Sequence, residues 1–167
     1  MTKVYLAYGS NLNHQQMVKR CPNASYLGNT MLKDWRLIFK SVATIEKDLG
    51  NYVPVGVFEI TDTCEKALDI YEDYPQLYDK KELDVILDGT QVTAMTYIMV
   101  GKYGIAPPSR KYFNVISEGY KNCDLNLDFL LEAHENSIKA DSGKGYESAR
   151  WKQCCLLYTS PSPRDRG

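Results

Sequence analysis

The sequence contains no apolar run that approaches the length of a membrane-spanning helix, and no signal-peptide pattern follows its first residues. It also lacks an excess of charge of one sign. The 20 Lys and Arg residues stand against 21 Asp and Glu residues and leave a formal net charge of −1. This balance gives no electrostatic reason to expect nucleic acid or an anionic membrane as a partner. We therefore expect no nucleic-acid partner and no membrane partner.

Histidine is scarce, and cysteine shows no metal-ligand spacing. The chain has two histidines, His14 and His134, and its five cysteines do not fall into the paired pattern that a zinc site requires. We therefore predict that the protein binds no metal. Cysteines without a disulfide pattern are typical of a reducing compartment, so we expect a cytoplasmic protein.

The composition is that of one globular domain. A chain of 167 residues with 44% hydrophobic and 25% charged residues is long enough to bury a core. We predict a single domain over residues 1–153. Residues 155–165 resemble the translation of a transposase sequencing adapter. We interpret residues 154–167 as a non-native, adapter-derived tail or as a natural disordered tail rich in Ser and Pro.

The most informative stretch lies near the N-terminus, where a strand pattern meets turn residues. Residues 4–8 are β-branched, aromatic and aliphatic, and they predict a strand. Residues 9–11 then break this strand, and residues 13–20 predict a short helix capped by Asn11 or Asn13. A strand, a glycine turn and a helix start leave backbone N–H groups that can bind an anion such as a carboxylate. The alternative is that these residues form a turn and nothing more.

Strand patterns dominate the middle of the chain. Residues 53–60 form the strongest of them, and Gly56 within it indicates a bulge or a close backbone approach. Residues 46–52 before it have the composition of a polar loop. Residues 78–87 and 91–100 predict a β-hairpin, because an Asp-Gly pair separates them.

Two amphipathic helices are predicted in the second half of the chain, over residues 110–120 and 127–139, with Ser109 as the cap of the first. The chain also contains 13 tyrosines. They can line a polar pocket, although a half-buried sheet rich in tyrosine accounts for most of them. Tyr97 has the register of an inward-facing strand residue, and the alternative role for it is cross-strand packing.

A further helix is predicted after residue 61, because Thr61 can cap its start and Pro75 ends it. This places Glu72 in the last turn, at the negative end of the helix dipole, where ionisation of a carboxyl group is disfavoured. If this carboxyl is also desolvated, its pKa rises toward the range that a general base needs at neutral pH. The alternative is a solvated surface glutamate, as most glutamates are.

Several of these segments together resemble the γ-glutamylcyclotransferase family. They occur in the order and at the spacing of that family between about residue 3 and about residue 130. The matching residues are 5–12 at the first strand, 43–45 and 55–60 in the middle, 68–73 around Glu72, then 97–99, 106–109, Tyr112 and Gly119.

The resemblance implies an α+β fold with a small, mixed, β-barrel-like sheet, flanking helices and a cavity at one end. It also implies an enzyme without a cofactor that releases 5-oxoproline from a small-molecule γ-glutamyl substrate. Glu72 is the catalytic acid and base by this resemblance, and a homodimer is consistent with it. The implied substrate-binding residues are Tyr5, Leu6, Ala7, Tyr8, Gly9, Ser10 and Tyr97. One departure is Asp73, which stands where the family commonly has Gly. Its carboxylate raises the pKa of Glu72 further if the two groups are close, or it points to solvent.

Three functions remain open at this point. The first is a cyclotransferase for γ-glutamyl amino acids or dipeptides, and the second is a cyclotransferase for γ-glutamyl amines. The third is a non-catalytic binding protein of the same fold. An intact Glu72 argues against the third function, and the part of the pocket that receives the leaving group decides between the first two.

Overall fold

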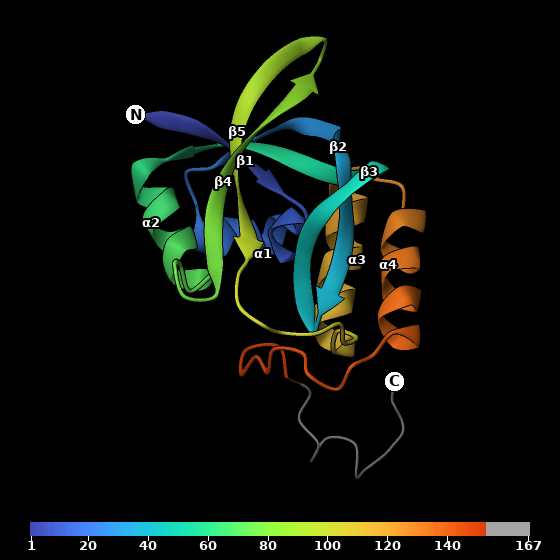
Figure 1. The fold of residues 1–167 in the computed structure, drawn as a ribbon. Helices are drawn as coiled ribbons and strands as arrows, with labels where there is room; N and C mark the ends of the chain where they lie inside the picture. Colours follow the sequence, from blue (N-terminus) through green and yellow to red (C-terminus); the bar gives the residue numbers. More distant parts are fainter. Residues whose placement is uncertain (153–167) are drawn as a thin grey trace.

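The structure is a computed structural model, and it describes residues 1–152. The tail predicted over residues 154–167 lies outside the described residues. Within the described part the chain forms five strands, four α-helices and one short 3-10 helix (Figure 1). In chain order they are β1 (Thr2–Ala7), η1 (Ser10–Leu12), α1 (His14–Arg20), β2 (Ser25–Lys40), β3 (Val42–Thr61), α2 (Asp62–Tyr71), β4 (Tyr78–Leu87), β5 (Thr90–Met99), α3 (Arg110–Asn122) and α4 (Asp128–Lys139).

The strands form one mixed sheet in the order β2-β3-β1-β5-β4. The β1 strand pairs with β5 in parallel, and every other neighbouring pair is antiparallel. The expected α+β fold is therefore confirmed, but the sheet is not closed into a barrel. Its two edges still approach each other, because the Thr30 hydroxyl of β2 donates a hydrogen bond to the Ile86 carbonyl of β4 at 2.5 Å.

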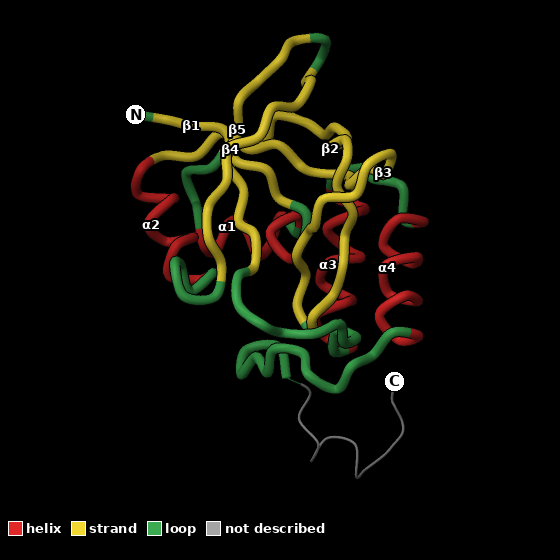
Figure 2. The backbone as a smooth tube through the Cα atoms, viewed as in Figure 1, coloured by secondary structure: helices red, strands yellow, loops and turns green. Residues whose placement is uncertain are grey.

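The helices lie on two sides of this curled sheet. Figure 1 shows α2 beside β4, and α3 and α4 next to the long β2–β3 hairpin. Figure 2 shows that the loop segment after α4 runs back beneath the sheet toward the ends of β3 and β5. This arrangement gathers the first loop, the end of α2 and the last described residues at one end of the molecule.

Local signals in the sequence explain most of the element boundaries. Thr61 caps α2 by accepting a hydrogen bond from the Cys64 backbone N–H, and Ser109 caps α3 in the same way. The predicted turn between β4 and β5 is confirmed, with φ of 50° at Asp88 and 81° at Gly89. Each of these predictions depended on contacts within four residues.

The prediction of a polar loop over residues 46–52 is wrong. These residues belong to β3, where Lys47 pairs with Trp35 and Tyr52 pairs with Lys33. A register shift between these two pairs leaves a bulge, and the Asp34 carboxylate accepts a hydrogen bond from the Gly50 N–H. The strand continues through these polar residues because its pairing with β2 stabilises it. The composition of residues 46–52 alone does not reveal that pairing.

Two glycines let other elements approach the backbone closely, through side chains at Gly56 and through backbone at Gly119. A Cβ at Gly56 would lie 3.0 Å from Leu12 Cδ2 and 3.1 Å from Cys123 Sγ, which confirms the close approach predicted for this strand. A Cβ at Gly119 of α3 would lie 2.6 Å from the Asn13 N atom. The short helix η1 is thus pressed directly against α3, and this contact holds the loop that follows β1.

Candidate active site

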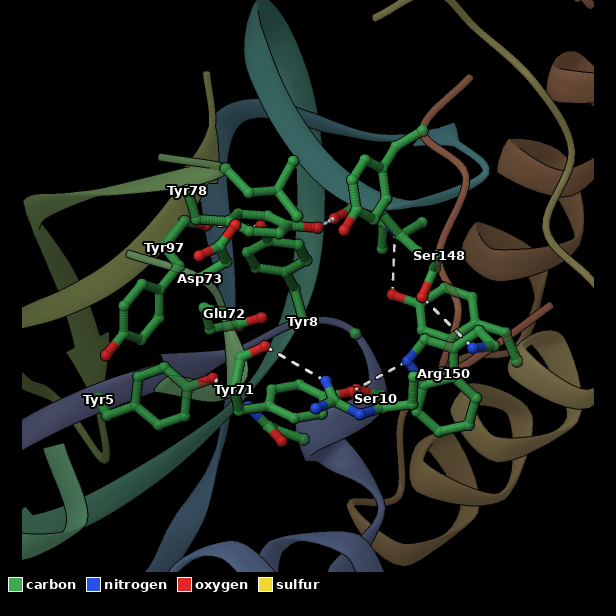
Figure 3. A pocket seen from close by; sticks show the side chains of 18 residues that line it. Tyr5, Tyr8, Ser10, Tyr71, Glu72, Asp73, Tyr78, Tyr97, Ser148 and Arg150 are labelled. Carbon is green, nitrogen blue, oxygen red and sulfur yellow. Dashed lines mark hydrogen bonds between the residues drawn. The ribbon is translucent and has the colours of Figure 1, made fainter. Parts of the chain in front are cut away.

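A pocket opens at the end of the sheet where β1 ends and α2 meets the following loop (Figure 3). Its cavity volume is about 70 Å³, or about 610 Å³ when all the space between the lining residues is counted together with the open solvent at the mouth. Its walls come from β1, η1, β3, β4, β5, α3, the end of α2 and the segments after α2 and α4. The lining residues are Tyr5, Tyr8, Gly9, Ser10, Asn11, Val42, Ala43, Tyr71, Glu72, Asp73, Leu77, Tyr78, Tyr97, Tyr112, Tyr146, Ser148, Arg150 and Trp151.

Glu72 lies in the middle of this pocket, as predicted for the end of α2. It is the C-terminal cap of that helix, and its backbone N–H donates to the Leu68 carbonyl at 2.8 Å. Burial of the carboxyl group raises its pKa to about 7, although the positive charges of Arg20 and Arg150 act in the opposite direction. A carboxyl group with this pKa can both accept and return a proton at neutral pH.

The Asp73 side chain is exposed to solvent, which is one of the two positions considered for it. Its backbone has a φ of 53°, in the left-handed region that glycine adopts without strain and that Asp tolerates better than most residues. The backbone at this position is therefore one that glycine adopts freely and that Asp tolerates.

This conformation can be tested with a pair of variants. We expect Asp73→Val to lower the free energy of unfolding by at least about 1 kcal/mol relative to Asp73→Gly, because a β-branched residue is strained at positive φ. Urea denaturation of both variants measures the difference. Equal stability of the two variants would contradict the left-handed conformation at this position.

The predicted substrate loop divides into residues that face the pocket and residues that face the core. Tyr5, Tyr8, Gly9 and Ser10 line the pocket, whereas Leu6 and Ala7 are buried in the hydrophobic core. Gly9 lies against neighbouring side chains, since a Cβ there would be 3.3 Å from Ala43 Cβ. The Ser10 hydroxyl is 2.8 Å from the Tyr71 hydroxyl, which ties the loop to the end of α2.

Tyr97 faces inward, but its hydroxyl group is directed away from Glu72 (Figure 3). This hydroxyl donates to the Asp69 carboxylate at 2.6 Å, and Asp69 also forms an ion pair with Lys80. The backbone carbonyl of Tyr97 accepts a hydrogen bond from the Tyr8 hydroxyl at 2.5 Å. The Tyr97 ring therefore lines the pocket, and its backbone carbonyl orients the Tyr8 side chain.

Other pocket residues were not identified from the sequence. The Tyr78 hydroxyl donates to the Ala43 carbonyl at 2.6 Å, and the Tyr112 hydroxyl accepts from the Ala43 N–H at 3.0 Å. Tyr112 keeps its own O–H donor for a group in the pocket. The high tyrosine content was a signal for such a lining, but it did not single out these two positions.

The segment after α4 supplies the remaining wall. The Trp151 indole N–H donates to the Tyr71 hydroxyl at 3.1 Å, and the Arg150 guanidinium lies 4.2 Å from the centre of the Tyr71 ring. Arg20 covers the same ring at 3.5 Å. Tyr71 is thus held between two cations, directly before Glu72 in the chain.

Among residues 1–152, no group of three or more His, Cys, Asp or Glu side chains could hold a metal ion. No helix in this range is long and apolar enough to span a membrane.

The chain is similar to known proteins in both sequence and fold. The model of the family described as "Gamma-glutamyl cyclotransferase, AIG2-like" matches residues 5–120. The γ-glutamylcyclotransferase of Bos taurus is 30% identical over 156 residues, covering 85% of this chain and 81% of the bovine protein. The Homo sapiens protein of the same name is 29% identical over 140 residues, covering 75% and 74%.

A solved structure described as a γ-glutamyl cyclotransferase superimposes with a TM-score of 0.73 at 26% identity. The match covers 90% of this chain and 95% of that structure. Sequence and fold therefore agree over most of the described residues, and the protein belongs to the γ-glutamyl cyclotransferase, AIG2-like family.

Proposed function

We propose that this chain is a γ-glutamylcyclotransferase that releases 5-oxoproline from a γ-glutamyl amino acid or dipeptide, with Glu72 as general acid and base. Family membership supports the activity. The assignment of Glu72 rests on the position of its carboxyl group inside a tyrosine-lined pocket, where burial raises the pKa of that group to about 7. We further propose that the enzyme acts in the cytoplasm, that it can form a homodimer, and that it needs no metal or cofactor.

The reaction needs proton transfer and a folded substrate conformation. Glu72 accepts a proton from the substrate α-ammonium group, and the free amine attacks the γ-carbonyl carbon of the same molecule. The five-membered ring closes, Glu72 returns its proton to the leaving nitrogen, and the bond to that nitrogen breaks. The ring nitrogen still carries one proton more than the lactam N–H of 5-oxoproline, and this proton passes to the released amine, which leaves as an ammonium group. The products are 5-oxoproline and a free amino acid or dipeptide, and Glu72 ends ionised as it began.

The substrate α-carboxylate binds in this proposal at the backbone of Gly9 and Ser10, the part of the first loop that faces the pocket. The Tyr112 hydroxyl is a donor for the oxyanion that forms at the γ-carbonyl, because its oxygen accepts from the Ala43 N–H and its O–H remains available as a donor. Tyr8 and Tyr78 both donate to backbone carbonyls, so their role is to shape the pocket.

The panel assay that tests this function measures 5-oxoproline release from γ-glutamyl amino acids, γ-glutamyl dipeptides and γ-glutamyl amines. Release from the first two classes is the expected result. Preferred release from the amines would favour the γ-glutamylamine cyclotransferase instead. Binding of these compounds by a folded protein with no product formed would favour a binding protein.

The pH dependence follows from the raised pKa of Glu72. The carboxylate must be ionised to accept a proton, so kcat/KM is expected to rise with pH through a pKa of about 7 in the free enzyme. An unperturbed glutamate would give the same rise near pH 4.3. Initial rates at low substrate concentration between pH 5 and 8 measure this limb, and a flat profile over that range would contradict the assignment.

A further inference from the structure

The Arg150 guanidinium occupies an unusual position at the mouth of the pocket. Its side chain is exposed and stacks on the Tyr71 ring at 4.2 Å, while its Nη1 donates to the Tyr71 carbonyl at 3.3 Å. The residue it covers directly precedes Glu72. In the view of Figure 3, Arg150 and Ser148 lie on one side of Glu72, and Tyr5 and Tyr97 lie on the other. The cation is thus fixed close to the reaction centre.

Several N–H donors of the Arg150 guanidinium are available to a ligand. Within residues 1–152 the ion pairs join Lys3, Lys80, Arg36 and Lys139 to carboxylates, and none of them includes Arg150. An arginine carries five N–H donors in a planar fork that matches a carboxylate. One of these donors is used by the backbone of Tyr71. The remaining donors can bind an anion that enters the pocket.

Arg20, the second cation on the Tyr71 ring, uses its terminal N–H donors in hydrogen bonds within the fold. Its two terminal nitrogens donate to the side-chain oxygens of Asn11 and Gln16. Arg20 does not line the pocket, whereas Arg150 does. Of the two guanidinium groups, Arg150 is the one that a ligand can reach.

A second cavity adjoins the pocket and shares Tyr146, Ser148 and Trp151 with it. Its other lining residues include Pro107, Ser109 and Lys152, whereas Arg150 lines the first pocket alone. A γ-glutamyl amino acid has two carboxylates: one on the glutamyl part, and one on the leaving amino acid. The proposed function places the first at the Gly9 and Ser10 backbone. The second carboxylate is the group that a γ-glutamyl amine lacks.

Resting on the proposed function, the geometry points to Arg150 as the binding site for the carboxylate of the leaving amino acid or peptide. The guanidinium then selects γ-glutamyl amino acids over γ-glutamyl amines, because only the former present an anion at the pocket mouth. A charge-assisted hydrogen bond of this kind contributes about a 10- to 100-fold difference in affinity.

The test uses a matched pair of ligands, γ-glutamyl-alanine and γ-glutamyl-ethylamide, which differ in the leaving-group carboxylate alone. Calorimetry measures both dissociation constants for Glu72→Gln, which retains the pocket without turnover, and for Glu72→Gln combined with Arg150→Gln. We expect Arg150→Gln to weaken γ-glutamyl-alanine binding about 10- to 100-fold and to change ethylamide binding far less. Arg150→Lys should restore part of the difference, because it keeps the charge but not the planar fork.

A control variant is Arg36→Gln in the same background, because Arg36 pairs with Glu46 on the β2–β3 hairpin. It should leave the ratio of the two dissociation constants unchanged. Equal weakening of both ligands by Arg150→Gln would show that Arg150 contacts the glutamyl part, and it would overturn the proposal. An unchanged ratio, or no binding of either ligand before Arg150 is replaced, would also overturn it.

Turnover separates this proposal from the proposed function. In the Glu72-containing protein, Arg150→Gln also removes a charge that lowers the pKa of Glu72, so the rates with both substrates shift together. The kcat/KM for γ-glutamyl-alanine divided by that for γ-glutamyl-ethylamide is free of this shared shift. Arg150→Gln is expected to lower this ratio about 10- to 100-fold. Absence of 5-oxoproline from both substrates, with selective binding intact, would refute the proposed function and leave the Arg150 site standing.

Discussion

Replacing Glu72 by Gln is expected to reduce 5-oxoproline release by about 10²- to 10⁴-fold, the usual contribution of a positioned acid and base. The amide cannot accept the α-ammonium proton, although it has the size of the carboxyl group. Substrate binding should persist, because the loop at Gly9 and Ser10 and the wall at Arg150 are unchanged. Initial rates and calorimetry on the same preparation measure both properties.

The pH dependence of stability provides a folding control for the Glu72→Gln variant. The folded-state pKa of Glu72 is raised to about 7, above the value near 4.3 for an unfolded glutamate. The wild-type protein therefore loses stability as pH rises from about 4.3 to about 7, because only the unfolded state then ionises freely. Glu72→Gln should match the wild type near pH 4 and be more stable than the wild type at pH 8.

Thermal unfolding at the two pH values measures this difference. A variant that is inactive and also less stable at pH 8 would point to misfolding rather than to loss of the base. A variant with near wild-type rates would show that another group transfers the proton.

Replacing Gly119 by Ala is expected to have the largest effect on stability. A Cβ at this position of α3 would lie 2.6 Å from the Asn13 N atom and 2.7 Å from the backbone carbon and the Cβ of Leu12. Two of these three neighbours are backbone atoms, so no flexible side-chain end can move aside. We expect the free energy of unfolding to fall by about 1–3 kcal/mol, as in other overpacked sites.

Helix propensity alone predicts the opposite sign for this change, since Ala is about 1 kcal/mol more favourable than Gly inside a helix. Glu118→Ala is the matched control, because the neighbouring Glu118 is exposed and should change stability by about 0.5 kcal/mol or less. Urea denaturation of both variants separates the two effects. A Gly119→Ala protein more stable than the wild type would show that α3 can move away from η1 freely.

The fold was predictable where short-range signals decide it. The caps at Asn13, Thr61 and Ser109 and the Asp-Gly turn each depend on contacts within a few residues, and the structure contains all of them. The loop expected over residues 46–52 is instead strand, because its pairing with β2 is not a local property of the sequence. Whether the sheet closes into a barrel likewise depends on contacts between its edge strands β2 and β4, which are far apart in the sequence.

The site was predictable in part for the same reason. The segment around Glu72 and the first loop carry a family motif, and both reach the pocket. The direction of the Tyr97 hydroxyl depends on Asp69, which lies in another element. Arg150 and Trp151 stand in a polar, glycine-containing stretch with no periodicity, so nothing in the local sequence marks them as part of a pocket.

The wall formed by Arg150 and Trp151 has a consequence for synthesis. A ribosome delivers the chain from the N-terminus onward, so the first loop and Glu72 emerge long before the residues that close the pocket. A nascent chain that ends after α4 holds the base but not this wall. The enzyme would thus acquire its complete site only after Arg150 and Trp151 have left the ribosome, and product release would report that this wall has docked.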